Sequence, residues 1–248
     1  MMKGIILAGD SGNRLNSITR GIPKQLLPVY DKPMIHYPIE TLVGAGIKDI
    51  LIITSSQYFA NFISALGDGS AFGACFSYSI QASPDGAAQA FTIAEEFLDK
   101  SPVCFITGDC IIIGDDRDVK LRKAIRAAQN SGQATIFLSK EYDPAQYGVA
   151  KLDKKGKCEE VKSNFDERRD YSITGLYVFP KGVAEFAKVI EKSERGRYEV
   201  TTLNQLYLKE NKLQAQVLGD NYKWFDTNTV DNLLSISNYL QNKKRKAL

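Results

Sequence analysis

The chain has 248 residues, of which 44% are hydrophobic and 25% charged, and this balance excludes intrinsic disorder as its main state. Its 32 lysine and arginine residues against 29 aspartate and glutamate residues leave a formal net charge of +3, too small and too mixed to indicate a nucleic-acid partner. No apolar stretch is long enough to cross a membrane, so we expect no membrane partner either. Four cysteines without a Cys-x-x-Cys pair indicate neither zinc nor disulfides, and we expect a cytoplasmic protein.

Three short runs that are apolar throughout lie in the first half of the chain, at residues 5–9, 49–54 and 103–108. Such runs are typical of strands buried on both faces, as in a parallel sheet. Between and after them, the apolar spacing predicts four helices. These lie at residues 33–45, with Pro33 in the first turn, and at 56–66, 87–98 and 118–130. The alternation predicts an α/β fold with a doubly wound, mostly parallel, Rossmann-like sheet.

From about residue 134 the pattern changes to short strands with little helix between them. We expect strands at residues 134–139, 148–152, 158–161 and 173–179, with a hairpin turn at 154–157. Helices follow at 181–192 and 199–210, then a strand at 213–218 and a last helix at 230–242. We find no linker, so we expect one domain over residues 1–248. In it, residues 134–248 add a β-rich elaboration to a sheet built by residues 1–133.

Glycines and a charged side chain follow the first apolar run, where an open α/β sheet binds its ligands. Gly9 and Gly12 would let backbone N–H groups approach an anion, and Arg14 adds a cation with several hydrogen-bond donors. The segment lacks the Gly-Lys-Ser/Thr ending of a P-loop, which excludes that motif. A plain turn between strand and helix is the alternative interpretation.

Two further features suggest chemistry. Lys24 and Gln25 lie between two prolines, on a segment that is otherwise typical of a surface loop. Asp109 follows the third apolar run, and Asp226 stands in the sequence Trp-Phe-Asp-Thr. Each aspartate alone is more typical of a helix cap or a turn. As a pair they predict a Mg²⁺ site, because Mg²⁺ binds one or two carboxylates together with phosphates and water.

In this order and spacing, the motifs resemble those of the sugar-1-phosphate nucleotidyltransferases, most closely the short-form glucose-1-phosphate thymidylyltransferases. The resemblance extends from Lys3 to about Asn232. The matching segments are residues 4–9, Gly12 with 14–15, 24–28, 31–35, 66–70, 83–86 with 89–90, 108–109 and 147–149. Long-form members continue with further C-terminal helices that help to build a regulatory nucleotide-sugar site, which we do not expect here.

The resemblance implies a Mg²⁺-dependent enzyme in which a sugar-1-phosphate attacks the α-phosphate of dTTP or UTP and pyrophosphate leaves. Residues 1–133 would bind the nucleoside triphosphate and residues 134–248 the sugar-1-phosphate. The residues that match catalytic positions are Arg14, Lys24 and Lys162. Those that match nucleotide-binding positions are Ala8, Gly9, Gly12, Gln25, Gln81 and Gly86. Those that match sugar-phosphate positions are Tyr147, Gly148, Lys162, Ile173 and Trp224, and those that match metal positions are Asp109 and Asp226.

Several positions depart from the family pattern. Asp10 adds a negative charge where phosphates approach, unless it caps the following helix. Cys110 and Asn228 replace the family residues that follow the two metal positions. Val161 stands where the family carries a carboxylate that binds sugar hydroxyls, so we expect a sugar other than glucose, or a less strict choice of sugar.

Two hypotheses remain open at this point. The first is an active enzyme that uses a pyrimidine nucleoside triphosphate and a sugar-1-phosphate. The second is a degenerate homologue that binds a nucleotide or a sugar nucleotide without turnover and has a regulatory or scaffold role. Either one is compatible with a homo-oligomer.

Overall fold

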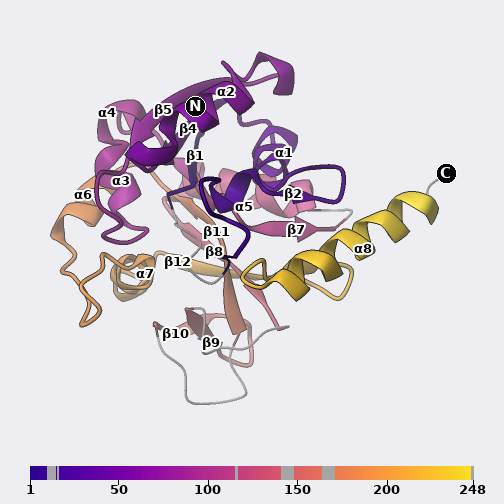
Figure 1. Ribbon diagram of the computed structural model, residues 1–248. Coiled ribbons are helices and arrows are strands. Elements are labelled where there is room, and N and C mark those ends of the chain that lie inside the picture. Colours follow the sequence, from indigo (N-terminus) through magenta and orange to yellow (C-terminus); the bar gives the residue numbers. More distant parts are fainter. Residues whose placement is uncertain (10–14, 16, 115–116, 141–147, 164–170, 247–248) are drawn as a thin grey trace.

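The computed structural model describes residues 1–9, 15, 17–114, 117–140, 148–163 and 171–246 (Figure 1). Within them the chain forms an α/β fold around a nine-stranded sheet with the order β10-β9-β11-β6-β1-β4-β5, in which β8 pairs with β11 and β12. The predicted fold class is confirmed. Within this sheet, every antiparallel pair involves a strand from the second half of the chain.

Four strands from the first half of the chain pair in parallel within the sheet. They are β6 (Val103–Thr107), β1 (Lys3–Leu7), β4 (Asp49–Thr54) and β5 (Cys75–Ile80). β1, β4 and β6 are the three apolar runs, and most of their side chains are buried. The sequence pattern misses β5. This strand pairs only with β4 in the described sheet, and of its six residues only Phe76 is buried, so it carries no continuous apolar run.

The helices of the first half are α1 (His36–Gly44), α2 (Phe59–Leu66), α3 (Gln89–Ile93), α4 (Glu95–Leu98) and α5 (Arg117–Ser131). α1 begins later than predicted, because Pro33 belongs to an antiparallel ribbon of β2 (Pro28–Val29) and β3 (Lys32–Pro33). The single helix predicted at 87–98 is divided at Ala94, whose ψ of 4° departs from helical geometry. Short 3₁₀ helices occur at Lys24–Leu26, Ser56–Tyr58 and Ser70–Phe72.

The second half contributes strands β8 (Ala134–Ser139), β9 (Val149–Leu152), β10 (Cys158–Lys162), β11 (Tyr171–Phe179) and β12 (Leu213–Val217). Its helices are α6 (Val183–Val189), α7 (Val200–Lys209) and α8 (Val230–Lys246). All of them lie where the sequence predicts them, within a few residues. Because β11 pairs with β6, one sheet continues from the first half of the chain into the second.

A separate antiparallel pair, β7 (Ile111–Ile113) and β13 (Lys223–Phe225), is absent from the sequence prediction. Phe225 lies opposite Ile111 in this pair. Asp109 precedes β7 and Asp226 follows β13, so the pairing brings the two aspartates to the same end of the ribbon.

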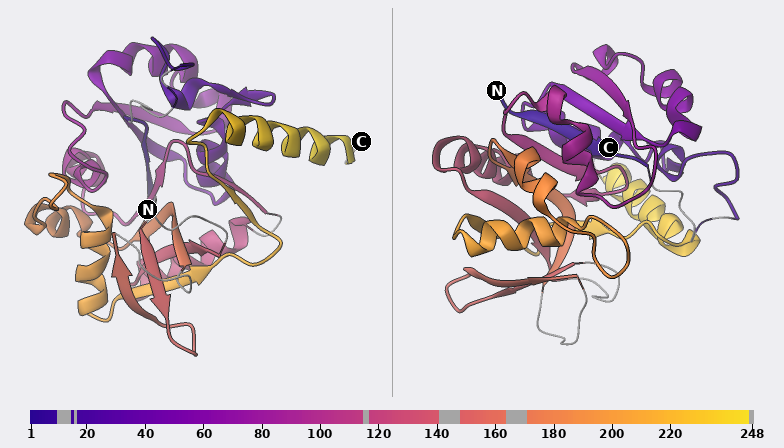
Figure 2. Two further views of the ribbon diagram at one scale, coloured as in Figure 1. Left: turned by 60° about the horizontal axis from the view of Figure 1, so that its bottom comes forward. Right: turned by 90° about the vertical axis from the view of Figure 1, so that its left-hand side faces the viewer.

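Helices cover both faces of the central sheet (Figures 1 and 2). On one face α1, α2 and α5 contribute Leu42, Phe62 and Leu121 to an apolar cluster. On the other face α3 and α7 contribute Phe91 and Leu203 to a second cluster. This burial on both sides explains why β1, β4 and β6 are apolar throughout.

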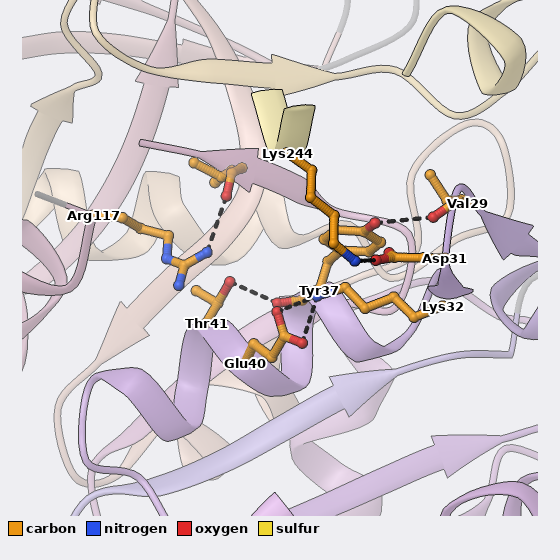
Figure 3. A network of polar contacts seen from close by, with 9 residues as sticks. Val29, Asp31, Lys32, Tyr37, Glu40, Thr41, Arg117 and Lys244 are labelled. Carbon is orange, nitrogen blue, oxygen red and sulfur yellow. Dashed lines mark hydrogen bonds and ion pairs between the residues drawn. The ribbon is translucent and has the colours of Figure 1, made fainter. Parts of the chain in front are cut away.

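The long helix α8 packs against β2 and the start of α1 and extends away from the rest of the molecule (Figure 1). Its residue Leu233 is buried in a third apolar cluster with Val29 and Tyr37. Near its end, Lys244 pairs with Asp31 at 2.8 Å, close to the Tyr37 hydroxyl that donates a hydrogen bond to the Val29 carbonyl (Figure 3). Among the described residues, none of the helices combines the length and the apolar character that a membrane span needs.

Candidate active site

A cavity of about 490 Å³ opens at the carboxyl end of β6. Lys24 and Asp109 from the first half of the chain line one part of it, and Ile173 and Thr201 from the second half line another. Its position agrees with the rule that open α/β sheets bind ligands beyond the carboxyl ends of their strands.

Lys24 is the centre of a hydrogen-bonded network at this cavity. The Lys24 side chain is 1% exposed, and its Nζ donates to Asp109 Oδ2 at 2.7 Å and to Asn228 Oδ1 at 2.9 Å. The Asn228 backbone N–H in turn donates to Asp226 Oδ1 at 2.9 Å. The structure therefore joins three predicted site residues, Lys24, Asp109 and Asp226, through a fourth residue, Asn228.

The network is held in place by the ends of two elements. Asp226 lies between β13 and α8, and its Oδ2 accepts a hydrogen bond from the Asn232 side chain in the first turn of α8 at 3.0 Å. The Thr227 hydroxyl donates to the Asp109 carbonyl at 3.4 Å. These contacts attach the start of α8 to the end of β6, and so fix Asp226 relative to Asp109.

The Asp109 carboxylate is stabilised in its charged form. Burial by itself raises the pKa of Asp109, but the neighbouring Lys24 charge, with hydrogen bonds from Lys24 and Thr107, outweighs burial and holds this pKa below its ordinary value of 3.8. Asp109 is therefore an anion at neutral pH, as a metal ligand has to be.

Cys110 lines the same cavity but is not a nucleophile. Its thiol donates to the Thr174 carbonyl at 2.9 Å, and its side chain is 2% exposed. Burial, followed by the negative charge of Asp109, raises the pKa of the Cys110 thiol well above its ordinary value. The thiol stays protonated, and a protonated thiol is unreactive.

Gln81, directly after β5, belongs to a second group of polar contacts outside the described lining of the cavity. Its side-chain amide donates to the Gly86 carbonyl at 3.1 Å and to Gln89 Oε1 at 2.8 Å. A Cβ atom on Gly9 would lie 2.8 Å from Gln81 Oε1, so the segment after β1 packs closely against this amide. The structure thus brings together three predicted nucleotide-binding residues, Gly9, Gln81 and Gly86.

Gln25 and Ala8 lie against Gly108, next to Asp109. A Cβ atom on Gly108 would come within 3.0 Å of Gln25 Cγ and 3.1 Å of Ala8 Cβ. Gln25 is 1% exposed, and its Oε1 is buried without a hydrogen-bond partner in the described part of the chain. A buried acceptor of this kind calls for a donor, which a bound ligand would supply. Gln25 therefore groups with the Lys24–Asp109 side of the site, whereas Gln81 contacts Gly86.

Gly148, Ile173 and Trp224, which the resemblance places around the sugar phosphate, all line the cavity. The Ile173 N–H donates to the Gly148 carbonyl at 2.8 Å, and this bond joins the start of β11 to the residue before β9. A Cβ atom on Gly148 would lie 2.9 Å from Thr201 Oγ1, so glycine at this position leaves the space that Thr201 needs. Trp224 is buried in β13.

Lys162 and Val161 are not part of the described cavity lining. Lys162 ends β10 with a side chain that is 57% exposed and pairs with Glu160 at 2.7 Å. Val161 is buried in the apolar cluster that also contains Leu203 of α7. Neighbouring strand residues point to opposite faces, so Val161 faces the core and Lys162 the surface. The reason for expecting a sugar other than glucose, a valine in contact with the sugar, is not supported.

Four residues of the sequence prediction lie outside the described part of the structure. These are Gly12, Arg14 and Tyr147, expected at the site, and the departure Asp10. Their predicted roles stay predictions.

Comparison with known proteins shows that residues 3–243 of this chain match a family model described as Nucleotidyl transferase. The chain belongs to the nucleotidyl transferase family. It is 45% identical over 241 residues to the glucose-1-phosphate thymidylyltransferase of Neisseria meningitidis, with 97% of this chain and 83% of that relative covered. It is 43% identical over 240 residues to the glucose-1-phosphate thymidylyltransferase of Xanthomonas campestris pv. campestris, with 96% and 80% covered.

Solved structures agree with this family. A crystal structure of a Bacillus anthracis protein assigned as a glucose-1-phosphate thymidylyltransferase, in complex with a sucrose, superposes with a TM-score of 0.86 at 32% identity. That comparison covers 96% of this chain and 95% of the other. A UDP-glucose pyrophosphorylase complexed with UDP-glucose gives a TM-score of 0.84 at 22% identity over 98% of this chain and 100% of that one, and this likeness concerns the fold alone.

Several cavity residues of this nucleotidyl transferase escape reasoning from the sequence. They are Thr107, Thr174, Gly175, Tyr177, Arg197 and Glu199. Thr107 has a local signal, because it ends the strand that precedes Asp109. Arg197 and Glu199 have none, since the segment before α7 has the composition of an ordinary loop and reaches the cavity only through the fold.

The donor set around Asp109 and Asp226 suits Mg²⁺. Both residues offer carboxylate oxygens, the hard ligands that Mg²⁺ prefers. The described residues contain no cluster of three or more His, Cys, Asp or Glu side chains that could enclose a metal by themselves. Two carboxylates completed by substrate phosphates are the usual arrangement for Mg²⁺, so the residues present fit this ion.

Proposed function

We propose that this chain is a sugar-1-phosphate nucleotidyltransferase, which joins a sugar-1-phosphate to dTTP or UTP and releases pyrophosphate. The observation that carries the proposal is the network of Lys24, Asp109, Asn228 and Asp226. Lys24, Asp109 and Asn228 of this network line one cavity whose walls come from both halves of the chain. The family match and the relatives named glucose-1-phosphate thymidylyltransferase support it.

The residues suit a displacement at phosphorus. Such a step needs alignment of the reactants and neutralisation of charge more than proton transfer. Lys24 has three N–H donors, of which Asp109 and Asn228 accept two within the described structure. The third would bind a phosphate oxygen of the nucleoside triphosphate. Arg14, after β1, would add a second cation, as its match to the family implies.

We assign Asp109 and Asp226 as the ligands of a Mg²⁺ ion. When bound, the ion neutralises negative charge on the triphosphate and on the leaving pyrophosphate. The low pKa of Asp109 keeps that carboxylate available to the ion at neutral pH. Asn232 and the Asn228 N–H hold the Asp226 carboxylate in a fixed orientation.

Gln81 and Gly86 form the proposed base site. Thymine and uracil present an N–H between two carbonyl oxygens, and an amide side chain beside a backbone carbonyl and N–H groups can match that edge. A purine is wider and offers a different order of donors and acceptors, so we expect the site to prefer dTTP or UTP to ATP or GTP.

Glucose-1-phosphate is the first sugar substrate to test. The relatives' names refer to it, and the buried position of Val161 removes the argument against it. Gly148, Ile173, Thr201 and Trp224 would surround the sugar phosphate, as cavity-lining residues of the second half.

The test is pyrophosphate release with Mg²⁺ over a panel of dTTP, UTP, ATP and GTP, each with glucose-1-phosphate and its deoxy and N-acetylated analogues. We expect release with a pyrimidine triphosphate, and a loss of at least about 100-fold in Asp109→Asn, because removing one well-placed electrostatic contact costs at least that much. Asp153→Asn is the matched control, since Asp153 caps the hairpin between β9 and β10 and lies outside the cavity lining.

The same assay distinguishes the second hypothesis. If no combination releases pyrophosphate while calorimetry detects a bound pyrimidine triphosphate, the chain is a binding protein without turnover. If neither release nor binding occurs, the proposal is wrong in both forms.

A further inference from the structure

The loop that carries Gly86 is attached directly to the segment before α7. The Tyr198 N–H donates to the Asp85 carbonyl at 2.6 Å, and the Ala88 N–H donates to the Tyr198 carbonyl at 3.0 Å. Gly86 lies between these bonds with φ +117°, and a Cβ atom there would lie 2.4 Å from the Tyr198 oxygen. Only glycine allows the two backbones to come this close.

Side chains reinforce the attachment. The Asp85 carboxylate accepts a hydrogen bond from the Ser83 hydroxyl at 2.6 Å and pairs with Lys192 at 3.3 Å. The Lys192 ammonium lies 5.2 Å from the centre of the Tyr198 ring. We call the contact between residues 83–88 and residues 192–198 the clasp.

Further contacts within residues 193–199 join the clasp to the start of α7. The Ser193 N–H donates a hydrogen bond to the Arg197 carbonyl at 2.9 Å and closes a turn. The Ser193 hydroxyl donates to Glu199 Oε1 at 3.2 Å, and Arg195 pairs with the same oxygen at 3.1 Å. Movement of Tyr198 would therefore carry Glu199, the N-cap residue of α7, with it.

The two sides of the clasp reach different parts of the site. On one side, the Gly86 carbonyl accepts the hydrogen bond from Gln81 in the proposed base site. On the other side, Arg197, Glu199 and Thr201 line the cavity, and Thr201 lies against Gly148, a proposed sugar-phosphate position. A shift of the loop at Gly86 would therefore be passed on to Arg197, Glu199 and Thr201 through the hydrogen bonds at Tyr198 and the chain that follows it.

We infer that the clasp couples the two substrates, so that a pyrimidine triphosphate held by Gln81 and Gly86 positions Glu199 and Thr201 for the sugar-1-phosphate. The inference rests on the proposed function. Asp85, Lys192 and Tyr198 are positioning residues in it, because they act through the backbone of the two segments and not on the reacting atoms. Coupling of this kind is reciprocal, so the sugar-1-phosphate also tightens the binding of the triphosphate.

The experiment measures glucose-1-phosphate affinity by calorimetry, with and without a saturating dTTP analogue whose α,β-bridge is methylene and cannot be cleaved. In the native protein we expect the analogue to tighten glucose-1-phosphate binding by at least about 5-fold, the lower end of typical coupling between sites. In Lys192→Ala we expect the coupling to fall by about 2- to 5-fold, the range that an exposed ion pair accounts for. Lys212→Ala, which breaks the exposed Lys212–Glu210 pair beyond the other end of α7, is the control that keeps the coupling.

A second pair of variants tests the backbone contact itself. Tyr198→Pro removes the N–H that donates to Asp85, whereas Tyr198→Ala keeps it. We expect the proline variant to lose the coupling and the alanine variant to retain most of it. Circular dichroism and thermal unfolding establish that each variant is folded, and Lys192→Ala carries the test should the proline variant fail to fold.

The outcomes separate the clasp from the proposed function. If the native protein binds both ligands but shows no coupling, or if Lys192→Ala and Tyr198→Pro couple them as the native protein does, the clasp inference is overturned and the proposed function stands. If the native protein binds no pyrimidine triphosphate analogue, the proposed function fails and the inference fails with it.

Discussion

Asp109 illustrates how a single residue of this site depends on its partner. The Lys24 ammonium at 2.7 Å offsets the cost of burial and keeps the carboxylate charged. The same pair removes Lys24 from solvent almost completely. Each side chain is therefore stable in the site because the other is present, and loss of one leaves the other without its counterion.

The lowered pKa of Asp109 predicts a pH-dependent contribution to stability. Because the pKa is lower in the folded state than in the unfolded state, this contribution is complete above about pH 3.8 and is lost as the pH falls through the folded value. At neutral pH we expect the unfolding free energy of the native protein to be about 2 kcal/mol higher than that of Asp109→Asn, which is typical of a hydrogen bond to a charged group. Urea unfolding over a pH series should show this difference shrinking on the acid side, and a constant difference would contradict the assignment.

Val161 gives a second prediction at the scale of a residue. Because its side chain is buried among apolar neighbours, Val161→Glu places a carboxylate in the core and should lower the free energy of unfolding by about 3 kcal/mol. Lys162→Glu puts the same group on the exposed face of β10 and should cost less than about 1 kcal/mol. Urea unfolding compares the two. Equal stability of both variants, with an altered preference among sugar phosphates in Val161→Glu, would return Val161 to the sugar site.

At the scale of elements, β11 shows how a strand is adapted to the cavity. Its register with β8 shifts between Ile173 and Tyr177, so that four positions of β11 span two of β8. Gly175 lies in this irregularity with φ +83°. Ile173 and Tyr177, at the two ends of this irregularity, both line the cavity, as does Gly175 between them.

Gly175→Ala tests this adaptation. A Cβ atom at Gly175 would lie 2.8 Å from Thr107 Oγ1, and alanine in the left-handed region costs about 1–2 kcal/mol. Gly156→Ala is the matched control, because Gly156 has φ +79° but open space around its Cβ position. We expect both variants to be destabilised in urea unfolding, Gly175→Ala more than Gly156→Ala, and only the former to lose activity. Equal effects would show that the contact with Thr107 is unimportant.

At the scale of the whole molecule, the two-sided packing of the sheet decides which groups solvent can reach. Of the four cysteines, Cys75 on the edge strand β5 is exposed, and Cys104, Cys110 and Cys158 are buried. Burial raises the pKa of Cys158 to about 11 and that of Cys104 further still. A thiol that is both buried and protonated reacts only after the structure opens.

We therefore expect one thiol per folded chain to react rapidly with an aromatic disulfide reagent, and all four to react in denaturant. Cys75→Ser should remove the fast reaction and leave the slow one unchanged. The release of the coloured thiolate, followed by absorbance, measures both phases. Rapid reaction of more than one thiol in the native protein would show that the sheet is less well covered than the structure indicates.

Much of the central architecture was predictable, because a segment that is buried in the fold has an apolar pattern in its own sequence. β1, β4 and β6 are covered on both faces, so each is a continuous apolar run, and the amphipathic helices between them follow the same logic. The position of Asp109 after such a strand, and the order of the motifs around it, already indicated a nucleotide site. The inferences about strands and helices hold because a residue's neighbours in the sequence are sufficient to make them, and the nucleotide site stays a prediction.

The contacts of the site itself depended on the tertiary structure. Lys24 lies 85 positions from Asp109 and 204 from Asn228, and no local pattern records a hydrogen bond over that distance. β7 and β13 have three residues each and form only because their partners are present, so neither has a signal of its own. Val161 and Lys162 are neighbours in the sequence, yet the pairing of β10 sends one to the core and the other to the surface. The sequence alone shows which residue types could carry the proposed chemistry. Strand pairing between distant segments determines which of them lie close together in space.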